Sequence, residues 1–390
     1  MTILSSNMVI DAAVALADVS DPDLAPFRGN LDLLVACINE EARLKPEAVP
    51  GVCRQLASGL RNRLEVSDWI RRHPEIRDEV IAEPIFLTGL PRSGTTYFQY
   101  LFDPEPNMRM LRYWEGDRPC PPPGFAPETI DERIKSCAEQ KAVQLTDATS
   151  AKIAQIHLSD ADGPEECLKI IDQTFINVGY LWPFRLPSYF SACLEGDRLL
   201  EAYEYHKLAL QLLQWKSESR RWVLKWPCHL VALGEIVTVH PQARFVVTHR
   251  DPIQALASNC SLTTMLRRSN SYDVDPHEIG QQMKEMLLGY LQRLVDFDAR
   301  HGNRMAHVSY RTAVEQPDVA MAQALDVLGI EMTASFQEAI VSWRKDNPPG
   351  KRGRHDYALE DYGLDADELA DEFAFYTERF DIASEQAART

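Results

Sequence analysis

Close pairs of cysteines and long apolar runs are both missing from this 390-residue sequence. The eight cysteines are dispersed, and no two lie within four residues of each other, which excludes the spacing of zinc ribbons and CxxC redox motifs. Dispersed cysteines in a long chain are typical of reduced thiols. No apolar run reaches the roughly 18 residues of a transmembrane helix, and the N-terminus lacks the basic segment of a signal peptide. We therefore expect a cytoplasmic protein with no membrane insertion.

An excess of positive charge is also missing. The chain has 41 Lys and Arg against 58 Asp and Glu, a formal net charge of −17. An acidic surface disfavours non-specific binding to nucleic acid, so we expect no nucleic-acid partner. If the ligand is an anion, its positive partners must be concentrated locally. The 45% apolar and 25% charged content is that of an ordinary globular protein.

Short apolar runs that alternate with helical patterns predict the fold. The runs cover residues 84–88, 222–226, 243–249 and 305–310, and a helix-like segment follows each of them. This alternation is typical of an α/β protein with a P-loop-like parallel sheet and helices on both faces. We expect an N-terminal helical extension over residues 1–82 and an α/β domain over residues 83–390. A large, mainly helical insertion, about residues 104–220, would follow the first strand and contribute an acceptor pocket.

The turn after the first predicted strand lacks a lysine. Residues 89–96 read GLPRSGTT, with the glycine spacing of the phosphate-binding GxxxxGK[ST] loop, but Thr95 stands where that loop has its lysine. Phosphoryl transfer needs that lysine on the phosphates, so its loss argues against an ordinary kinase or ATPase. Arg92 supplies a cation instead, as a planar fork suited to phosphate or sulfate oxygens. A Gly-Pro turn that binds no ligand is the alternative.

A second arginine follows the third predicted strand. Arg250 stands where that strand ends, at the sheet edge at which open α/β folds bind ligands, and Pro252 suits the start of a helix. Ser258 lies eight residues after Arg250, about two helical turns on, where it could face the same anion. A surface arginine and an ordinary helix serine are the alternative interpretation.

With these motifs the chain resembles the sulfotransferases that use 3′-phosphoadenosine 5′-phosphosulfate (PAPS), most closely a bacterial branch with LPRSGTT loops. The resemblance implies that Arg92, Ser93, Gly94, Thr95 and Thr96 hold the 5′-phosphosulfate. It also implies that Arg250 and Ser258 hold the 3′-phosphate and that Lys225, in VLKWP, reaches the bridging oxygen. Tyr310 would lie near the cofactor, and the basic cluster Lys351, Arg352 and Arg354 would close over the 3′-phosphate.

One departure from that family concerns the general base. Cytosolic members have a histidine two residues after the strand lysine, whereas this chain continues Lys225-Trp226-Pro227. Glu115 is the preferred candidate, since related sulfotransferases carry a glutamate at a similar offset from the loop. His157, in a histidine–acid cluster, is the competitor, because histidine titrates near neutral pH. A surface carboxylate and a packed histidine are the respective alternatives.

The sequence thus predicts a PAPS-dependent sulfotransferase in which Arg92 and Lys225 stabilise the leaving group, without a metal. Five aromatic residues in the segment 180–190 favour a hydrophobic alcohol or phenol as acceptor if they line a pocket, although core packing explains such a stripe equally well. Two other functions stay open. One is a P-loop phosphotransferase, and the other is a non-catalytic nucleotide-binding protein of the same fold.

Overall fold

The centre of the molecule is a parallel sheet. The computed structural model describes residues 3–146, 151, 160–347 and 358–385, and within them the sheet has five strands in the order β2-β3-β1-β4-β5. All four strand pairs are parallel. The strands are β1 (Ile85–Gly89), β2 (Met108–Met110), β3 (Arg221–Lys225), β4 (Arg244–His249) and β5 (Met305–Ser309).

The register of the sheet brings three strand ends together. Leu87 of β1 lies opposite Lys225 of β3, and Gly89 at the end of β1 lies opposite Thr248 of β4. Because the strands are parallel, the segments that leave them meet at one carboxyl edge. This edge therefore places the turn after β1 between the ends of β3 and β4.

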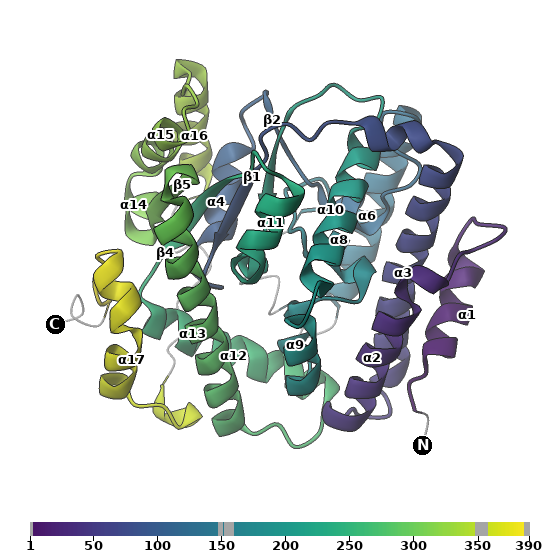
Figure 1. Ribbon diagram of the computed structural model, residues 1–390, viewed down its shortest axis with the longest axis horizontal. Helices are drawn as coiled ribbons and strands as arrows, with labels where there is room; N and C mark the ends of the chain where they lie inside the picture. Colours follow the sequence, from purple (N-terminus) through teal and green to yellow (C-terminus); the bar gives the residue numbers. More distant parts are fainter. Residues whose placement is uncertain (1–2, 147–150, 152–159, 348–357, 386–390) are drawn as a thin grey trace.

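Helices cover both faces of the sheet (Figure 1). Alternate residues of β1 point to opposite faces: Phe86 belongs to one apolar cluster, and Ile85 and Leu87 belong to another. The longer helices are α1 (Ser6–Leu16), α2 (Ala25–Glu41), α3 (Val49–Arg72), α4 (Thr95–Phe102), α6 (Ile130–Gln144), α10 (Arg198–Gln214), α12 (Pro252–Asn270), α13 (Pro276–His301), α15 (Pro317–Val327), α16 (Ala334–Asp346) and α17 (Ala366–Arg379). The short ones are α5 (Tyr113–Asp117), α8 (Leu168–Ile171), α9 (Pro187–Cys193), α11 (Leu233–Val239) and α14 (Tyr310–Glu315).

The two clusters divide the helices into layers. Helices α4, α15 and α16 pack on the face that carries Ile85 and Leu87. Helices α10 to α13 pack on the opposite face, and the buried side chains of α1 to α3 continue that same cluster outward to the edge of the molecule (Figure 1). Among the described residues, no helix combines the length and the apolar content needed to cross a bilayer.

The predicted α/β class and the four predicted strands are confirmed, with ends that shift by at most one residue. Two details of the prediction were wrong. The segment interpreted as a helical insertion also contains β2, a three-residue strand at the edge of the sheet. Tyr310, placed at the end of the last predicted strand, instead begins α14, since β5 stops at Ser309. The division at residue 82 stays a prediction.

Candidate active site

The turn between β1 and α4 is tightly enclosed, and two of its positions have room only for glycine. Gly89 has φ +149°, and a Cβ atom there would lie 2.4 Å from the carbonyl oxygen of Thr248. Gly94 has φ +86°, and its Cβ would lie 2.6 Å from the ring of Tyr310. The backbone of the turn is thereby pressed between the end of β4 and the start of α14.

Side chains of the turn join it to its neighbours. Ser93 is fully buried, and its Oγ lies 2.7 Å from Oγ1 of Thr248. The N–H of Ser93 donates to the carbonyl oxygen of Leu90 at 3.0 Å, and α4 begins at Thr95. A helix N-terminus adds partial positive charge, so this tight turn is suited to an anion.

The structure brings together Arg92, Arg250 and Ser258, which the sequence singled out in separate motifs. Nε of Arg92 donates to Oγ of Ser258 at 3.1 Å, and Nη1 of Arg250 donates to the backbone carbonyl of Arg92 at 2.9 Å. Arg250 follows β4, and Ser258 is a buried residue of α12. The guanidinium of Arg250 also lies 4.5 Å from the ring centroid of Tyr310. Four predicted cofactor residues from distant parts of the chain thus form one cluster.

The remaining edge of Arg250 faces the C-terminal segment. Nε and Nη2 of Arg250 bond to the two carboxylate oxygens of Glu385 at 2.7 and 3.0 Å. Burial disfavours the charged guanidinium, but the hydrogen bonds and the negative charge of Glu385 outweigh this, so the pKa of Arg250 is raised above its ordinary value. Arg250 is therefore held as a cation.

Lys225 forms the second polar cluster of the site. Its side chain is fully buried at the end of β3, and Nζ donates to Oγ1 of Thr96 at 2.8 Å and to Oε1 of Glu166 at 2.5 Å. Thr96 lies in the first turn of α4, so the lysine connects its strand to the helix that starts at the anion-binding turn. The Glu166 carboxylate therefore pairs with this lysine inside the protein, where an unpaired partner would be costly.

Glu166 belongs to the histidine–acid cluster of the sequence, but sequence reasoning gave it no catalytic role. It forms a parallel β-bridge with Lys225, and the N–H of Cys167 donates to the Lys225 carbonyl at 2.8 Å. The sequence offered only a weak signal, an acid pair just before a short helix, which reads as helix capping. The structure instead aligns this segment with the end of β3 and directs the carboxylate of Glu166 to the lysine.

Glu115, the predicted base, contacts residues of the β2–α5 segment and not Lys225. One carboxylate oxygen accepts from Arg109 Nη2 at 2.7 Å and the other accepts from the N–H of Arg112 at 3.0 Å, at the N-terminus of α5. The side chain is 4% exposed. These contacts are those of a helix-capping carboxylate. His157 and the basic cluster Lys351, Arg352 and Arg354 lie outside the described residues.

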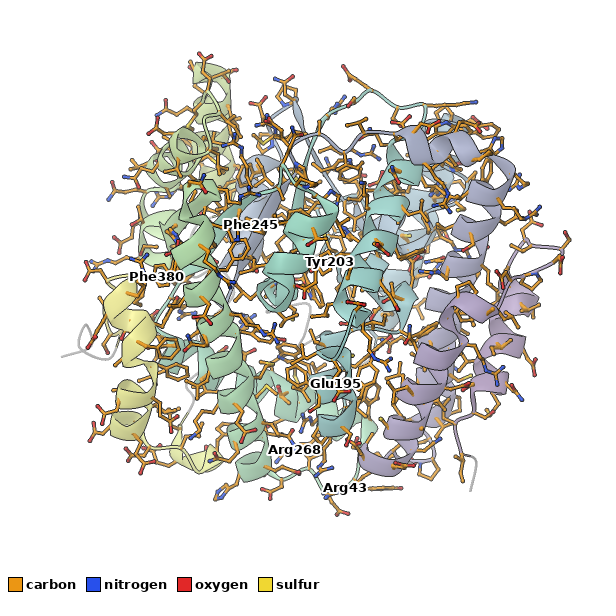
Figure 2. The ribbon with its side chains drawn as sticks, in the orientation of Figure 1. Arg43, Glu195, Tyr203, Phe245, Arg268 and Phe380 are labelled. Atoms are coloured by element: carbon orange, nitrogen blue, oxygen red, sulfur yellow. The ribbon has the colours of Figure 1, made fainter. Side chains whose placement is uncertain are left out.

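Two further groups of side chains belong to the core. His229, which follows Lys225 closely in sequence, is buried, and its Nδ1 lies 2.5 Å from the hydroxyl of Tyr203. Burial lowers the pKa of His229 well below its ordinary value. The aromatic segment 180–190 is packed in the apolar cluster as well, with Tyr180, Trp182, Phe184 and Tyr189 all buried. Tyr203 is labelled on α10 in Figure 2.

The site thus combines a glycine-containing turn at a helix N-terminus, two arginines and a buried lysine–carboxylate pair at the carboxyl edge of a parallel sheet. This arrangement is suited to an anion and lies at the sheet edge where open α/β folds bind their ligands. Among the described residues, no group of three or more His, Cys, Asp or Glu is arranged to hold a metal ion.

Comparison with known proteins identifies the family. The sequence model of the Sulfotransferase family matches residues 84–334, which include every strand described above, and the chain belongs to this family. The structure is similar to sulfotransferase STF9 from Mycobacterium avium, at 28% identity and a TM-score of 0.89, over 98% of each chain. It is also similar to sulfotransferase STF1 from Mycobacterium tuberculosis H37Rv, at 26% identity and a TM-score of 0.81, over 96% of this chain and 99% of that one. No curated protein matches the chain.

Proposed function

We propose that this protein transfers a sulfuryl group from PAPS to the hydroxyl of a small-molecule alcohol or phenol. Membership of the sulfotransferase family supports the reaction class. The observation that supports the donor is the cluster of Arg92, Arg250 and Ser258 beside the turn that begins α4. Guanidinium, hydroxyl and helix N-terminal N–H groups are the donor set that a doubly phosphorylated nucleotide requires.

In the proposed binding mode, PAPS supplies the activated sulfuryl group. Residues 92–96 hold its 5′-phosphosulfate, and Arg250 and Ser258 hold its 3′-phosphate, with help from Tyr310 and the basic cluster Lys351, Arg352 and Arg354. Lys225 donates to the oxygen on which negative charge grows, and Arg92 adds a second cation. Fixed donors of this kind in a buried site lower a barrier because they need no reorganisation during the reaction.

The geometry favours Glu166 over Glu115 as the residue that takes the acceptor's proton. The Glu166 carboxylate is 2.5 Å from Lys225 Nζ, whereas both Glu115 oxygens are bonded within the β2–α5 segment. In an in-line transfer the acceptor hydroxyl attacks the sulfur from the side opposite the leaving oxygen, so the base must reach the acceptor side of the sulfuryl group that Lys225 and Thr96 would contact. His157 stays a candidate from the sequence alone.

The eight cysteines support a cytoplasmic location for this reaction. All of them are free thiols, and seven are buried. Free thiols persist in reducing compartments. The aromatic segment 180–190, which would favour a hydrophobic acceptor if it lined a pocket, is packed in the core.

Turnover of sulfur-labelled PAPS tests the proposal. The purified protein is incubated with labelled PAPS and a panel of phenols and alcohols, or a cell extract, and labelled products are identified by mass spectrometry. We expect a sulfated hydroxyl product, and Lys225→Met to reduce its rate by about 100-fold or more. Lys135→Met, which removes an exposed lysine of α6, serves as the matched control and leaves the rate unchanged. Magnesium-dependent ATP turnover without sulfate transfer would favour the phosphotransferase alternative instead, and nucleotide binding without any transfer would favour a non-catalytic protein.

A further inference from the structure

The C-terminal segment after α17 reaches the proposed 3′-phosphate site. Glu385 stands six residues beyond the end of α17 at Arg379, and its carboxylate bonds to Nε and Nη2 of Arg250. The N–H of Glu385 donates to Oδ2 of Asp251 at 2.8 Å, so its backbone is fixed at the same place. The contact therefore has two points of attachment, one through the side chain and one through the main chain.

Helix α17 is itself anchored next to Arg250. The hydroxyl of Tyr376 lies 2.9 Å from Nδ1 of His249, the residue that precedes Arg250, and the ring of Phe380 lies 4.5 Å from the His249 ring. Arg379 donates to Asp298 at 2.6 Å. Figure 1 shows α17 beside α13 and close to β4, and Figure 2 labels Phe380 at the end of this helix that leads toward the C-terminus. The anchored helix therefore delivers the following residues to the edge of the sheet.

The two-pronged contact between Glu385 and Arg250 uses the same donors that a phosphate would use. The Nε and Nη2 edge of a guanidinium binds a carboxylate or a phosphate in the same bidentate way. Nη1 is bonded to the carbonyl of Arg92, so these contacts together use three of the five guanidinium N–H groups. A 3′-phosphate that binds the Nε and Nη2 edge of Arg250 must therefore replace the Glu385 carboxylate.

We propose that Glu385 is an internal competitor for the 3′-phosphate of the nucleotide, so that the C-terminal segment must leave Arg250 before the nucleotide can bind. This inference rests on the proposed function, because it requires that Arg250 bind the 3′-phosphate. Only the fraction of molecules in which Glu385 has left Arg250 can then bind the 3′-phosphate of the nucleotide. The apparent dissociation constant is then the intrinsic one divided by that fraction.

Calorimetric titration with two nucleotides tests the competition. Adenosine 3′,5′-bisphosphate carries the 3′-phosphate, and adenosine 5′-phosphate lacks it. We expect Glu385→Gln, which removes the charge but keeps the size of the side chain, to tighten binding of the bisphosphate by about threefold or more and to leave the monophosphate unchanged. Glu378→Gln, on the exposed face of α17, is the matched control and changes neither affinity.

The same titration separates failure of this inference from failure of the proposed function. If Arg250→Ala lowers the preference for the bisphosphate but Glu385→Gln does not raise it, the competitor is refuted and the nucleotide site stands. If Arg250→Ala leaves the preference unchanged, Arg250 is not the 3′-phosphate ligand, and both ideas fail. Equal tightening of both nucleotides by Glu385→Gln would also overturn the inference, because competition at Arg250 acts only on the 3′-phosphate.

Discussion

The guanidinium of Arg250 donates to the backbone carbonyl of Arg92 across 2.9 Å, although the two residues are 158 positions apart in the sequence. This bond ties the end of β4 to the turn after β1. In the proposed binding mode, it fixes the residue that binds the 3′-phosphate relative to the residues that bind the 5′-phosphosulfate. The spacing between the two anionic ends of the nucleotide is then set by the sheet rather than by flexible loops.

Arg250→Ala should weaken binding of adenosine 3′,5′-bisphosphate more than binding of adenosine 5′-phosphate. A hydrogen bond to a charged group contributes about 1.5–3 kcal/mol, so we expect a loss of about 10-fold or more for the bisphosphate. Because the Arg92 carbonyl also loses its partner, a small loss for the monophosphate is expected too. Calorimetric titration measures both affinities, and equal losses for the two nucleotides would refute the assignment of Arg250 to the 3′-phosphate.

Two conservative carboxylate substitutions distinguish the proposed base from a capping residue. Glu166→Gln should lower kcat by about 100-fold or more and leave nucleotide affinity nearly unchanged, since removal of a general base affects the chemical step. Glu115→Gln should preserve most of kcat but lower the free energy of unfolding by about 1–3 kcal/mol, because Arg109 loses its buried charged partner. Steady-state kinetics and urea unfolding of both variants provide the measurement. Loss of turnover in Glu115→Gln with full turnover in Glu166→Gln would restore Glu115 as the base.

The turn itself can be tested through Gly94. Gly94→Ala forces a Cβ atom to within 2.6 Å of the Tyr310 ring in a left-handed backbone conformation, so we expect a loss of stability of about 1–3 kcal/mol and weaker nucleotide binding. Gly234→Ala in α11 is the matched control, because a Cβ there meets no atom within 4 Å. Thermal unfolding measures both variants. An unchanged Tm and affinity in Gly94→Ala would show that the turn is not held against Tyr310.

The features predicted from the sequence are those that depend on local pattern. Apolar runs identified four strands, and the glycines of residues 89–96 identified the turn, because each pattern constrains its own segment of backbone. Strand β2 was not predicted, because its three residues, Met108–Met110, are too few to show an alternating pattern.

The features that sequence reasoning missed depend on contacts between distant residues. The Lys225–Glu166 pair spans 59 positions, and the Arg250–Glu385 pair spans 135. Glu385 stands in no motif, and Glu166 stands in the histidine–acid cluster without a sign of its partner. Each contact exists because the parallel register or the docking of α17 brings two distant segments to one edge. Glu115 illustrates the reverse case. Its offset from the turn predicted a catalytic role, and in the structure its carboxylate contacts Arg109 and the N–H of Arg112 at the start of α5, so its role as base stays a prediction.

A buried histidine makes the stability of the fold depend on pH. His206 of α10 is fully buried, and neither of its ring nitrogens has a hydrogen-bond partner among the described residues. Burial, with a smaller contribution from the charge of His240, lowers the pKa of His206 to about 3. The neighbouring His240 is affected in the same direction, with a pKa of about 4 that results mainly from burial. Both side chains are therefore neutral in the folded protein under mildly acidic conditions.

The sign of the effect follows from proton binding. In the unfolded chain a histidine has a pKa near 6.5, so below that pH the unfolded state binds a proton that the folded state does not. The free energy of unfolding should therefore fall as the pH decreases from about 6.5 toward 3, by up to about 1.4 kcal/mol per pH unit for each such histidine. Urea unfolding at pH 7, 6, 5 and 4 measures this slope. His206→Leu should reduce it by the contribution of one proton, about 1.4 kcal/mol per pH unit. Ile236→Val, a core substitution without a titrating group, should lower stability by the same amount at every pH. If His206→Leu had the same slope as the unsubstituted protein, His206 would not be held neutral by its burial.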